Sequence, residues 1–432
     1  MGRSVLDVFK GEFRMETAEY YKKAIGCGLI TINRQKVSAD KILHNNEFLR
    51  SMVHRHEPPV TGEPLDIITI DDEFVVVNKP ASIPVHPCGK YRHNTIIFML
   101  GKEHGLTGLH TIHRLDRLTS GLLMFARTRE VSQRVDGYVR ERKLTKVYVC
   151  KVDGQFPSEP FDCLEPIFTI SHKIGVCRVS ADGKQCKTAF KLLSYDGHTS
   201  IVQCTPHTGR MHQIRVHLQY LGYPIVNDPL YNNPVWGPDL GKGGNTPHSD
   251  EDLLTELIKQ HTAELKSQVI DDPDEFIKIT RHPLVKGTDT LDDMELNADE
   301  QGSRIESTDQ PTELNVCERG DKLAVESNET GGTGPHDQAA SSSQPSKAPP
   351  TASGSERKRP LESKDELTEP ELHRLVQGLC RECKLKLRDP APEEMIMYLH
   401  ALSYKGPDFE FSTLLPRWAE EHIQRSAAME AS

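Results

Sequence analysis

The sequence predicts an α+β fold: a large mixed, mainly antiparallel sheet with flanking helices, preceded by a small N-terminal α+β module. After Pro58-Pro59, runs rich in β-branched residues alternate with Gly, Pro and Asp turns, and helical stretches separate some of the runs. Residues 4–57 instead alternate apolar and basic positions, which suits a short helix and strand. A chain of 432 residues is long enough to bury two or three cores.

Residues 1–58 form the expected N-terminal module. The segment YYKKAIGCGLITINRQKV predicts a helix that runs through Gly26 and Gly28 into a strand at 29–32. Four basic residues crowd this helix-to-strand corner: Lys22, Lys23, Arg34 and Lys36. They suit contact with a phosphate backbone. A solvated basic face explains them equally well.

The main α+β domain is expected at 59–237. Its strands are predicted at 67–70, 75–78, 122–126, 146–152 and 200–204. Residues 238–365 are acidic and partly low in complexity, so we expect a disordered segment there. Order is expected again at 366–420, where a helical pattern is followed by LHALSYKGPDFEFSTLLPRWA, read as one or two strands. Residues 421–432 are expected to be a tail.

Charge and composition limit the partners. The formal net charge is -10, yet residues 238–365 hold 27 acidic and 14 basic residues, and the rest of the chain holds 36 and 39. The remainder is therefore mildly basic, which admits an RNA partner. Ten scattered cysteines favour a reducing, intracellular setting, without indicating the compartment. No apolar run of about 18 residues is present, so no membrane partner is expected.

The segment HTIHRLDRLTSGLLMFART places three polar side chains in a loop just before an apolar strand: His113, Arg114 and Asp116. A carboxylate at the mouth of a buried strand is poised for chemistry. The alternative is an ordinary turn, in which Asp116 accepts backbone N–H groups and Arg114 stays solvated.

The segment CTPHTGRMHQIRVHL concentrates polar side chains within eight residues: Arg210, His212, Gln213, Arg215 and His217. If the stretch is helical, Met211, Ile214 and Leu218 share the buried face. Arg215 lies near the edge of that face, so its guanidinium would point inward and pair with Asp116, keeping the carboxylate ionised. The alternative is a basic surface helix that touches phosphates.

Two strands add further candidates. In RKLTKVYVCKV, Lys146 and Tyr148 share a face, a combination that stacks a nucleobase and neutralises its phosphates. A half-buried core tyrosine is the alternative. In VVVNKPASIPVHP, Lys79 is a candidate RNA contact, although a structural strand exit is the favoured interpretation.

Together these segments resemble the RluA family of RNA pseudouridine synthases. HRLDRLTSG matches the family's catalytic motif, KVYVCKV its tyrosine strand, TGRMHQIRVHL its arginine motif and VNKPASIPVHP its first motif, in the family's order from about residue 60 to 236. VHPCGKYRHNT and LHALSYKGPDFEFSTLLPRWA look closer to the eukaryotic branch, which includes the transfer-RNA position-32 synthases. In that family LHA begins the closing strands of the catalytic domain, so the resemblance implies that 59–237 and 366–420 form one catalytic domain and that 238–365 is an insertion in it. Residues 1–58 resemble an S4-like RNA-binding module, and whether that module is complete stays open.

The resemblance implies a fold, a reaction and residue roles. The fold is that of the pseudouridine synthases, and the reaction converts uridine to pseudouridine in RNA, with tRNA expected first and mRNA second. Asp116 would be the nucleophile or base, Arg215 its partner, and Tyr148 the stacking surface and an aid to the last proton removal. Arg114 would fill the space that a flipped nucleotide leaves. Further RNA contacts are expected from five side chains: His113, Arg210, His212, Lys79 and Lys146.

The rearrangement involves no net redox change, so no cofactor is expected, and we expect a monomer. A zinc enzyme is the first rival, because Cys380 and Cys383 form a C-x-x-C pair. One pair supplies half of a four-ligand site, and no second C-x-x-C or H-x-x-x-H accompanies it, so no metal is expected. The second rival is an RNA-binding or RNA-folding protein that keeps the fold without turnover.

Overall fold

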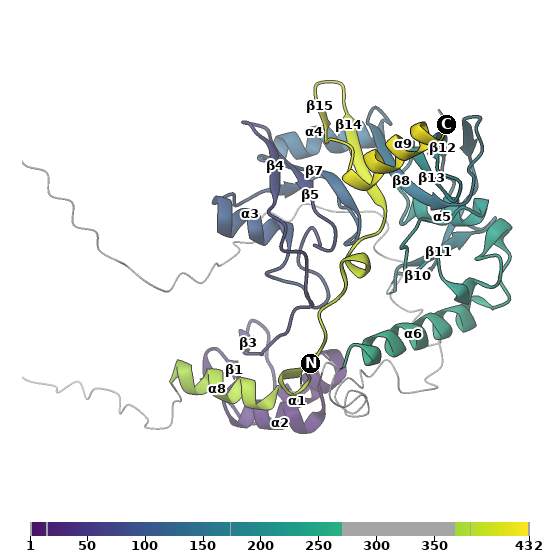
Figure 1. Cartoon of the computed structure of the whole chain (residues 1–432). Helices are drawn as coiled ribbons and strands as arrows, with labels where there is room; N and C mark the ends of the chain where they lie inside the picture. Colours follow the sequence, from purple (N-terminus) through teal and green to yellow (C-terminus); the bar gives the residue numbers. More distant parts are fainter. Residues whose placement is uncertain (1, 14–15, 173, 270–367, 381, 431–432) are drawn as a thin grey trace, which may run out of the picture. The chain divides into compact units, whose positions relative to one another are not determined.

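The large sheet carries the molecule's main core (Figure 1). The structure, a computed structural model, describes residues 2–13, 16–172, 174–269, 368–380 and 382–430. Within them, ten strands form this sheet in the order β4-β5-β7-β14-β8-β13-β12-β9, with β15 beside β14 and β6 beside β7. Neighbouring strands are antiparallel except β14 and β7, which run parallel. The predicted α+β class and the mixed, mainly antiparallel sheet are confirmed.

The strands of the large sheet have these bounds: β4 Asp66–Ile70, β5 Phe74–Lys79, β6 His110–Thr111, β7 Ser120–Ala126, β8 Thr145–Asp153, β9 Phe161–Cys163, β12 Thr188–Tyr195, β13 Thr199–Pro206, β14 Leu399–Lys405 and β15 Glu410–Ser412. Strands β10 (Ile167–Ser171) and β11 (Val176–Val179) form a separate hairpin. The accompanying helices are α3 Ile96–His104, α4 Arg129–Arg140, α5 Gln213–Leu221, α6 Asp250–Ser267 and α9 Arg417–Glu430. All five strands expected from the sequence are present.

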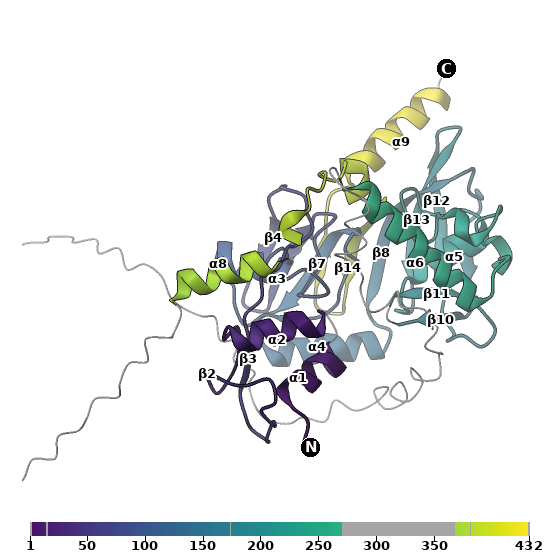
Figure 2. The same ribbon diagram turned by 90° about the horizontal axis from the view of Figure 1, so that it is seen from below.

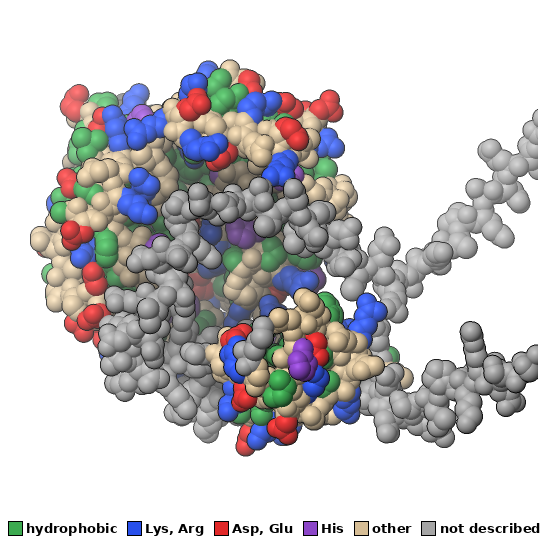
Figure 3. Space-filling view, turned by 180° about the vertical axis from the view of Figure 1, so that it is seen from behind, with side chains coloured by type: hydrophobic (Ala, Val, Ile, Leu, Met, Phe, Trp, Pro, Cys, Tyr) green, Lys and Arg blue, Asp and Glu red, His purple; other side chains and the backbone are tan. Residues whose placement is uncertain are grey.

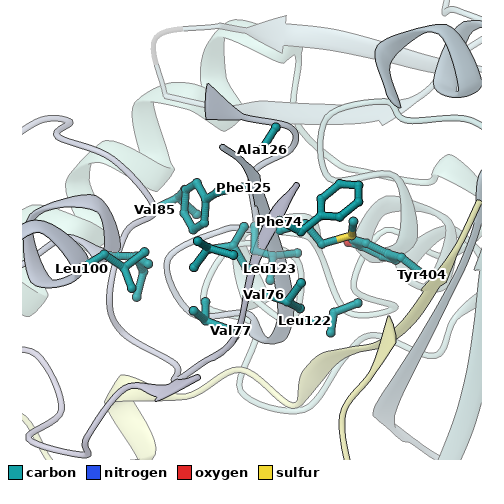
Figure 4. Close-up of a cluster of buried hydrophobic side chains, with 14 of the residues drawn as sticks. Phe74, Val76, Val77, Val85, Leu100, Leu122, Leu123, Phe125, Ala126 and Tyr404 are labelled. Carbon is teal, nitrogen blue, oxygen red and sulfur yellow. The ribbon is translucent and has the colours of Figure 1, made fainter. Parts of the chain in front are cut away.

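Strands β5 and β7 lie at the centre of the largest apolar cluster. Val75, Val76 and Val77 are all fully buried, so the strand reads as a continuous apolar run instead of alternating. Figure 4 shows the side chains of Val76 and Val77 together with Phe125 and with Tyr404, which β14 contributes from far along the chain. Strand β7 is likewise buried on both faces, which fixes the position of its first residues. The loop that precedes β7 is fixed with them.

Gly121 permits the parallel contact between β7 and β14. Its φ is +105°, and a Cβ at this position would lie 2.2 Å from the carbonyl oxygen of Ala401. A side chain would therefore force the two strands apart. The glycine in the TSG sequence is a packing requirement of the sheet.

Part of the segment expected to be a disordered insertion is ordered. Helix α6 begins after Ser249, whose hydroxyl accepts the backbone N–H of Asp252. Leu253 and Leu257, one turn apart, are buried against a cluster that includes Trp236. Helices α5 and α6 lie near β10 and β11 in two views (Figures 1 and 2). The prediction was wrong for 238–269 because an acidic composition concealed an apolar stripe, and 270–367 lie outside the described residues.

The N-terminal module consists of α1 Val5–Val8, a π-helical turn Phe9–Phe13, α2 Ala18–Gly26 and a small sheet in the order β2-β1-β3. These strands are β1 Ile30–Ile32, β2 Gln35–Lys36 and β3 Leu49–Ser51. The predicted helix and strand are therefore present. The S4-like resemblance stays a prediction.

Helix α8 (Glu369–Leu379) belongs to the N-terminal module. Val376 is buried in the same apolar cluster as Val5 and Ile25, with Leu372 and Leu379 packed against it. The assignment of the whole of 366–420 to the catalytic domain was therefore wrong for α8. Its amphipathic pattern predicted the helix but not which core the apolar face covers.

The expected tail at 421–432 is mostly helical. Helix α9 packs Ala419 against Val149 and Ile201 of the sheet, and His422 is fully buried. The two ring nitrogens of His422 bond the hydroxyls of Ser194 and Thr199 at 2.9 and 3.1 Å. Residues 417–430 therefore complete the sheet's cover. None of the described helices is both long and apolar enough to cross a membrane.

Candidate active site

Asp116 lies in a tight turn immediately before β7. The backbone N–H of Thr119 donates to the carbonyl oxygen of Asp116 at 3.1 Å, and the neighbouring Leu115 is buried in the main core. The Asp116 side chain remains 32% exposed. The turn thus anchors the backbone while leaving one carboxylate open to a ligand.

Arg215 projects from the first turn of α5 and joins two carboxylates. Its Nη1 donates to Oδ2 of Asp116 at 2.9 Å, and its Nε and Nη2 donate to the two oxygens of Asp228 at 2.8 Å each. The Arg215 side chain is 8% exposed and that of Asp228 is fully buried. The predicted Asp116–Arg215 pair is confirmed. Helix α5 begins at Gln213, so Met211, which the helical pattern placed on one face with Ile214 and Leu218, precedes the helix.

Asp228 is the residue that the sequence analysis missed. Its fork-to-fork contact fixes the plane of the guanidinium, and Oδ1 also accepts the backbone N–H groups of Leu230 and Tyr231. The left-handed Asn227 before it, with φ +61°, and the following Pro229 mark a turn. That Asn-Asp-Pro turn was the available signal, but nothing local indicates that the aspartate faces an arginine.

Tyr231 supports the same group from the opposite side. The guanidinium carbon of Arg215 lies 5.0 Å from the centroid of the Tyr231 ring, which is within cation–π range. The Tyr231 hydroxyl accepts the backbone N–H of Cys177 at 3.1 Å and bonds Nδ1 of His212 at 3.0 Å. Asp228 and Tyr231 therefore hold the guanidinium in place while its Nη1 donates to Asp116.

His212 lies beside the carboxylate as a neutral ring. Burial and the positive charge of Arg215 lower its pKa to about 4. Its Nε2 is 3.6 Å from Oδ2 of Asp116, and its backbone is left-handed, with φ +54°. The role of His212 as an RNA contact stays a prediction. The ring faces the Asp116 carboxylate through the edge that carries Nε2.

The charge on Asp116 is maintained against burial. Burial raises the pKa of this carboxyl group, but His212, the charge and hydrogen bond of Arg215, and the charge of Arg114 together bring its pKa below the ordinary value. Asp116 is therefore ionised at neutral pH. An ionised, oriented and partly exposed carboxylate is able to act as nucleophile or as base.

Two tyrosines from neighbouring strands form a pair in the same site. The hydroxyls of Tyr148 on β8 and Tyr404 on β14 lie 2.6 Å apart. Burial, together with the charge of Asp116, raises the pKa of Tyr148 to about 12, so the phenol lies in the electrostatic range of the carboxylate. Nζ of Lys146 lies 5.7 Å from the centroid of the Tyr404 ring. Tyr404, which the sequence analysis did not single out, thus orients Tyr148 and supports Lys146.

Lys79 does not face RNA. It is fully buried, and its Nζ donates to the carbonyl oxygens of Pro80, Ile83 and Arg117 at 3.0, 2.7 and 3.0 Å. The prediction that Lys79 contacts RNA was wrong. The favoured interpretation, a structural strand exit, agrees with its three hydrogen bonds. By binding the carbonyl of Arg117, the ammonium holds the loop that carries Asp116.

The other candidate contacts divide into buried and exposed groups. His113 is half-buried, because its Nε2 accepts the backbone N–H of Met124 at 3.2 Å and its ring packs edge-on against Tyr404; its role as an RNA contact stays a prediction. Arg210 is exposed, although its guanidinium donates to the carbonyl of Gln185 at 3.3 and 3.1 Å. Arg114 is exposed and makes no hydrogen bond or ion pair within the described part of the chain.

Comparisons with known proteins agree with this geometry. The family model described as RNA pseudouridylate synthase matches residues 73–220, which include Asp116, Tyr148 and Arg215. The human pseudouridylate synthase RPUSD2 is 43% identical over 98% of this chain and 71% of that protein. The mitochondrial tRNA pseudouridine(32) synthase of Saccharomyces cerevisiae is 46% identical over 56% of this chain and 53% of that protein.

Among solved structures, human RNA Pseudouridylate Synthase Domain Containing 1 is 27% identical, with a TM-score of 0.34, over 40% of this chain and 71% of that one. The sequence identity to the human synthase extends over nearly the whole chain. The protein with this ionised aspartate, its paired arginine and its tyrosine strand is therefore a member of the RluA-type RNA pseudouridine synthases.

Proposed function

We propose that the enzyme isomerises uridine to pseudouridine in transfer RNA, with Asp116 as its catalytic carboxylate. The observation that carries this proposal is the ionised Asp116, joined at 2.9 Å to an arginine that is itself locked by Asp228. Support for the substrate comes from yeast relatives named as tRNA pseudouridine(32) and tRNA pseudouridine(31) synthases. Messenger RNA is a second substrate to test.

The geometry supports a division of labour in the reaction. The target nucleotide leaves its stack, at a cost of a few kcal/mol, and Arg114 occupies the space that it vacates. Asp116 attacks the base or the ribose while the N1–C1′ bond breaks, and the base turns and bonds C1′ through C5. Any bond to Asp116 breaks as C5 bonds C1′, and the C5 proton departs while N1 takes up a proton, so the product is an isomer of the substrate and no electrons are gained or lost.

Tyr148 serves chiefly as a surface for the uracil. A phenol whose pKa is raised to about 12 stays protonated at neutral pH. Its ring, oriented by the hydroxyl of Tyr404, stacks on the base, and its hydroxyl relays the departing C5 proton as a hydrogen-bond partner.

Release of tritium from tRNA carrying C5-labelled uridine tests the central role. The variant Asp116→Asn keeps the size of the side chain and removes the charge, so we expect no release while tRNA binding persists. The matched control is Asp136→Asn on α4, an exposed carboxylate paired only with Arg140 one turn away. Turnover by Asp116→Asn would refute the assignment, and binding without turnover by the unaltered chain would favour the RNA-folding alternative.

Two finer points belong to this proposal. We expect a monomer, which sedimentation of the full chain checks. Because one yeast relative is a mitochondrial tRNA pseudouridine(32) synthase, the mitochondrion is the first compartment to examine by imaging the tagged protein.

A further inference from the structure

Two histidines and two cysteines from distant parts of the sequence meet outside the active site. One ligand atom from each of His54, His56, Cys380 and Cys383 lies within 4.8 Å of every other. Nε2 of His56 is 3.2 Å from Sγ of Cys383, across 327 positions of sequence. We propose that these four side chains bind one zinc ion.

The histidine half is set by an extended segment between β3 and β4. In extended backbone, residues two apart point to the same side, so His54 and His56 present their rings together, with centroids 4.7 Å apart. The next residue, Glu57, accepts the backbone N–H groups of His93 and Asn94 at 2.8 and 2.9 Å. This anchor fixes the direction of the histidine pair.

The cysteine half is set by the end of α8. Cys380 follows the helix, and Cys383 lies in the 3₁₀ turn Glu382–Lys384, so the C-x-x-C spacing brings both thiols to one side. Lys90 pairs with the Glu382 carboxylate at 2.9 Å. The turn is therefore tied to the segment just before α3, the same segment that Glu57 contacts.

The donor set selects the metal. Two thiolates and two imidazoles are typical ligands of structural zinc, while Mg²⁺ and Ca²⁺ require oxygen donors. Bonds of about 2.1 Å to nitrogen and 2.3 Å to sulfur place tetrahedral ligands about 3.6 Å apart, so binding needs shifts of about an ångström or less. Two thiolate charges also neutralise the dication.

Zinc would join the two segments that connect the N-terminal module and α8 to the large sheet. His54 and His56 lie where the chain leaves the N-terminal module for β4, and Cys380 and Cys383 lie where it leaves α8 for β14. Helix α8 already packs on the N-terminal module through Val376. The ion would add a second link, from the end of α8 to the segment that follows this module. The site is structural, since all four ligands come from protein and no position is left for a substrate.

Elemental analysis of the full chain, purified from zinc-supplemented medium, tests the proposal without any RNA. We expect about one zinc per chain, and at least about a tenfold loss of bound zinc in Cys380→Ser and in His56→Ala. The matched controls are Cys88→Ser and His104→Ala, which alter an exposed thiol and an exposed imidazole outside the cluster. Far-ultraviolet circular dichroism confirms that each variant is folded.

A second measurement needs no variant. Cobalt(II) exchanged into the wild-type chain should give the thiolate charge-transfer and intense d–d bands of a tetrahedral site. Zinc-free wild-type protein, a Cys380–Cys383 disulfide in protein made under reducing conditions, or zinc retained by Cys380→Ser would each overturn the proposal. Because these readouts use metal alone, they are independent of the proposed catalytic role of Asp116.

Discussion

At the residue scale, the site depends on one guanidinium shared by two carboxylates. Arg215 satisfies Asp228 through two hydrogen bonds and Asp116 through one, so the three groups carry one net negative charge. Asp228 is buried and forms no other ion pair with the residues that the structure describes, whereas Asp116 is partly exposed. The negative charge therefore remains on the carboxylate that a substrate can reach.

Asp228→Asn tests whether Asp228 acts by holding Arg215 in place. The amide leaves Arg215 without its buried counter-charge, and we expect a loss of about 3–5 kcal/mol in the free energy of unfolding. Urea denaturation measures this loss, and tritium release measures the accompanying fall in kcat. Asp239→Asn, at an exposed position, is the control. Unchanged stability in Asp228→Asn would contradict the arrangement.

Burial of neutral His212 makes the free energy of unfolding fall as the pH is lowered. Its pKa lies near 4 in the folded protein and near 6.5 in the unfolded chain, so between these values the unfolded chain binds more protons and acid favours unfolding. The full effect is about 3 kcal/mol, from 1.36 kcal/mol per pKa unit.

We expect the stability of His212→Gln to fall less than that of wild type between pH 6.5 and 4. Chemical denaturation at stepped pH values measures the two curves, with exposed His104→Gln as the control. Parallel curves for wild type and His212→Gln would show that the ring is not buried and neutral.

At the scale of elements, one glycine decides whether β14 can join the sheet. The chain reaches β14 only after residue 398, yet this strand lies between β7 and β8, which carry the Asp116 turn and Tyr148. Its Tyr404 then completes both the apolar core and the phenol pair. The parallel contact at Gly121 and Ala401 is the narrowest point of that insertion.

Gly121→Ala should destabilise the fold by several kcal/mol, since its Cβ would overlap the Ala401 carbonyl and its φ is unfavourable for an L residue. The matched change is Gly137→Ala in α4, where a Cβ meets nothing within 4 Å. There, helix propensity predicts a gain of about 1 kcal/mol. Thermal unfolding compares the two, and equal effects would argue against close packing of β7 on β14.

For the whole molecule, charge is separated along the sequence. The acidic residues concentrate at 238–365, and the remainder has a small basic excess. Figure 3 shows Lys and Arg interspersed with Asp and Glu among the described residues of one face, so the visible side chains there form no uniformly basic surface. RNA affinity is therefore expected to depend on a few placed cations.

Arg114→Ala should weaken tRNA binding and reduce the slope of log affinity against log salt by up to about one unit. The reason is that exposed Arg114 makes no internal ion pair in the described residues and remains available to a phosphate. Fluorescence anisotropy at stepped salt concentrations measures the slope. Arg417→Ala on α9 removes an exposed cation that is paired with Glu421, and it should leave the slope unchanged.

The sequence by itself determined the strands and the fold class, because apolar patterning is a local property of the chain, and its ordered motifs predicted the Asp116–Arg215 pair, which the folded chain then formed. Tertiary structure alone decided which aspartate locks Arg215, which tyrosine meets Tyr148, and that His54 and His56 face Cys380 and Cys383. Each of these pairings joins residues whose neighbours in sequence carry no sign of the partner. Side-chain contacts across long separations depend on how sheet and helices pack, and that packing is a property of the whole folded chain.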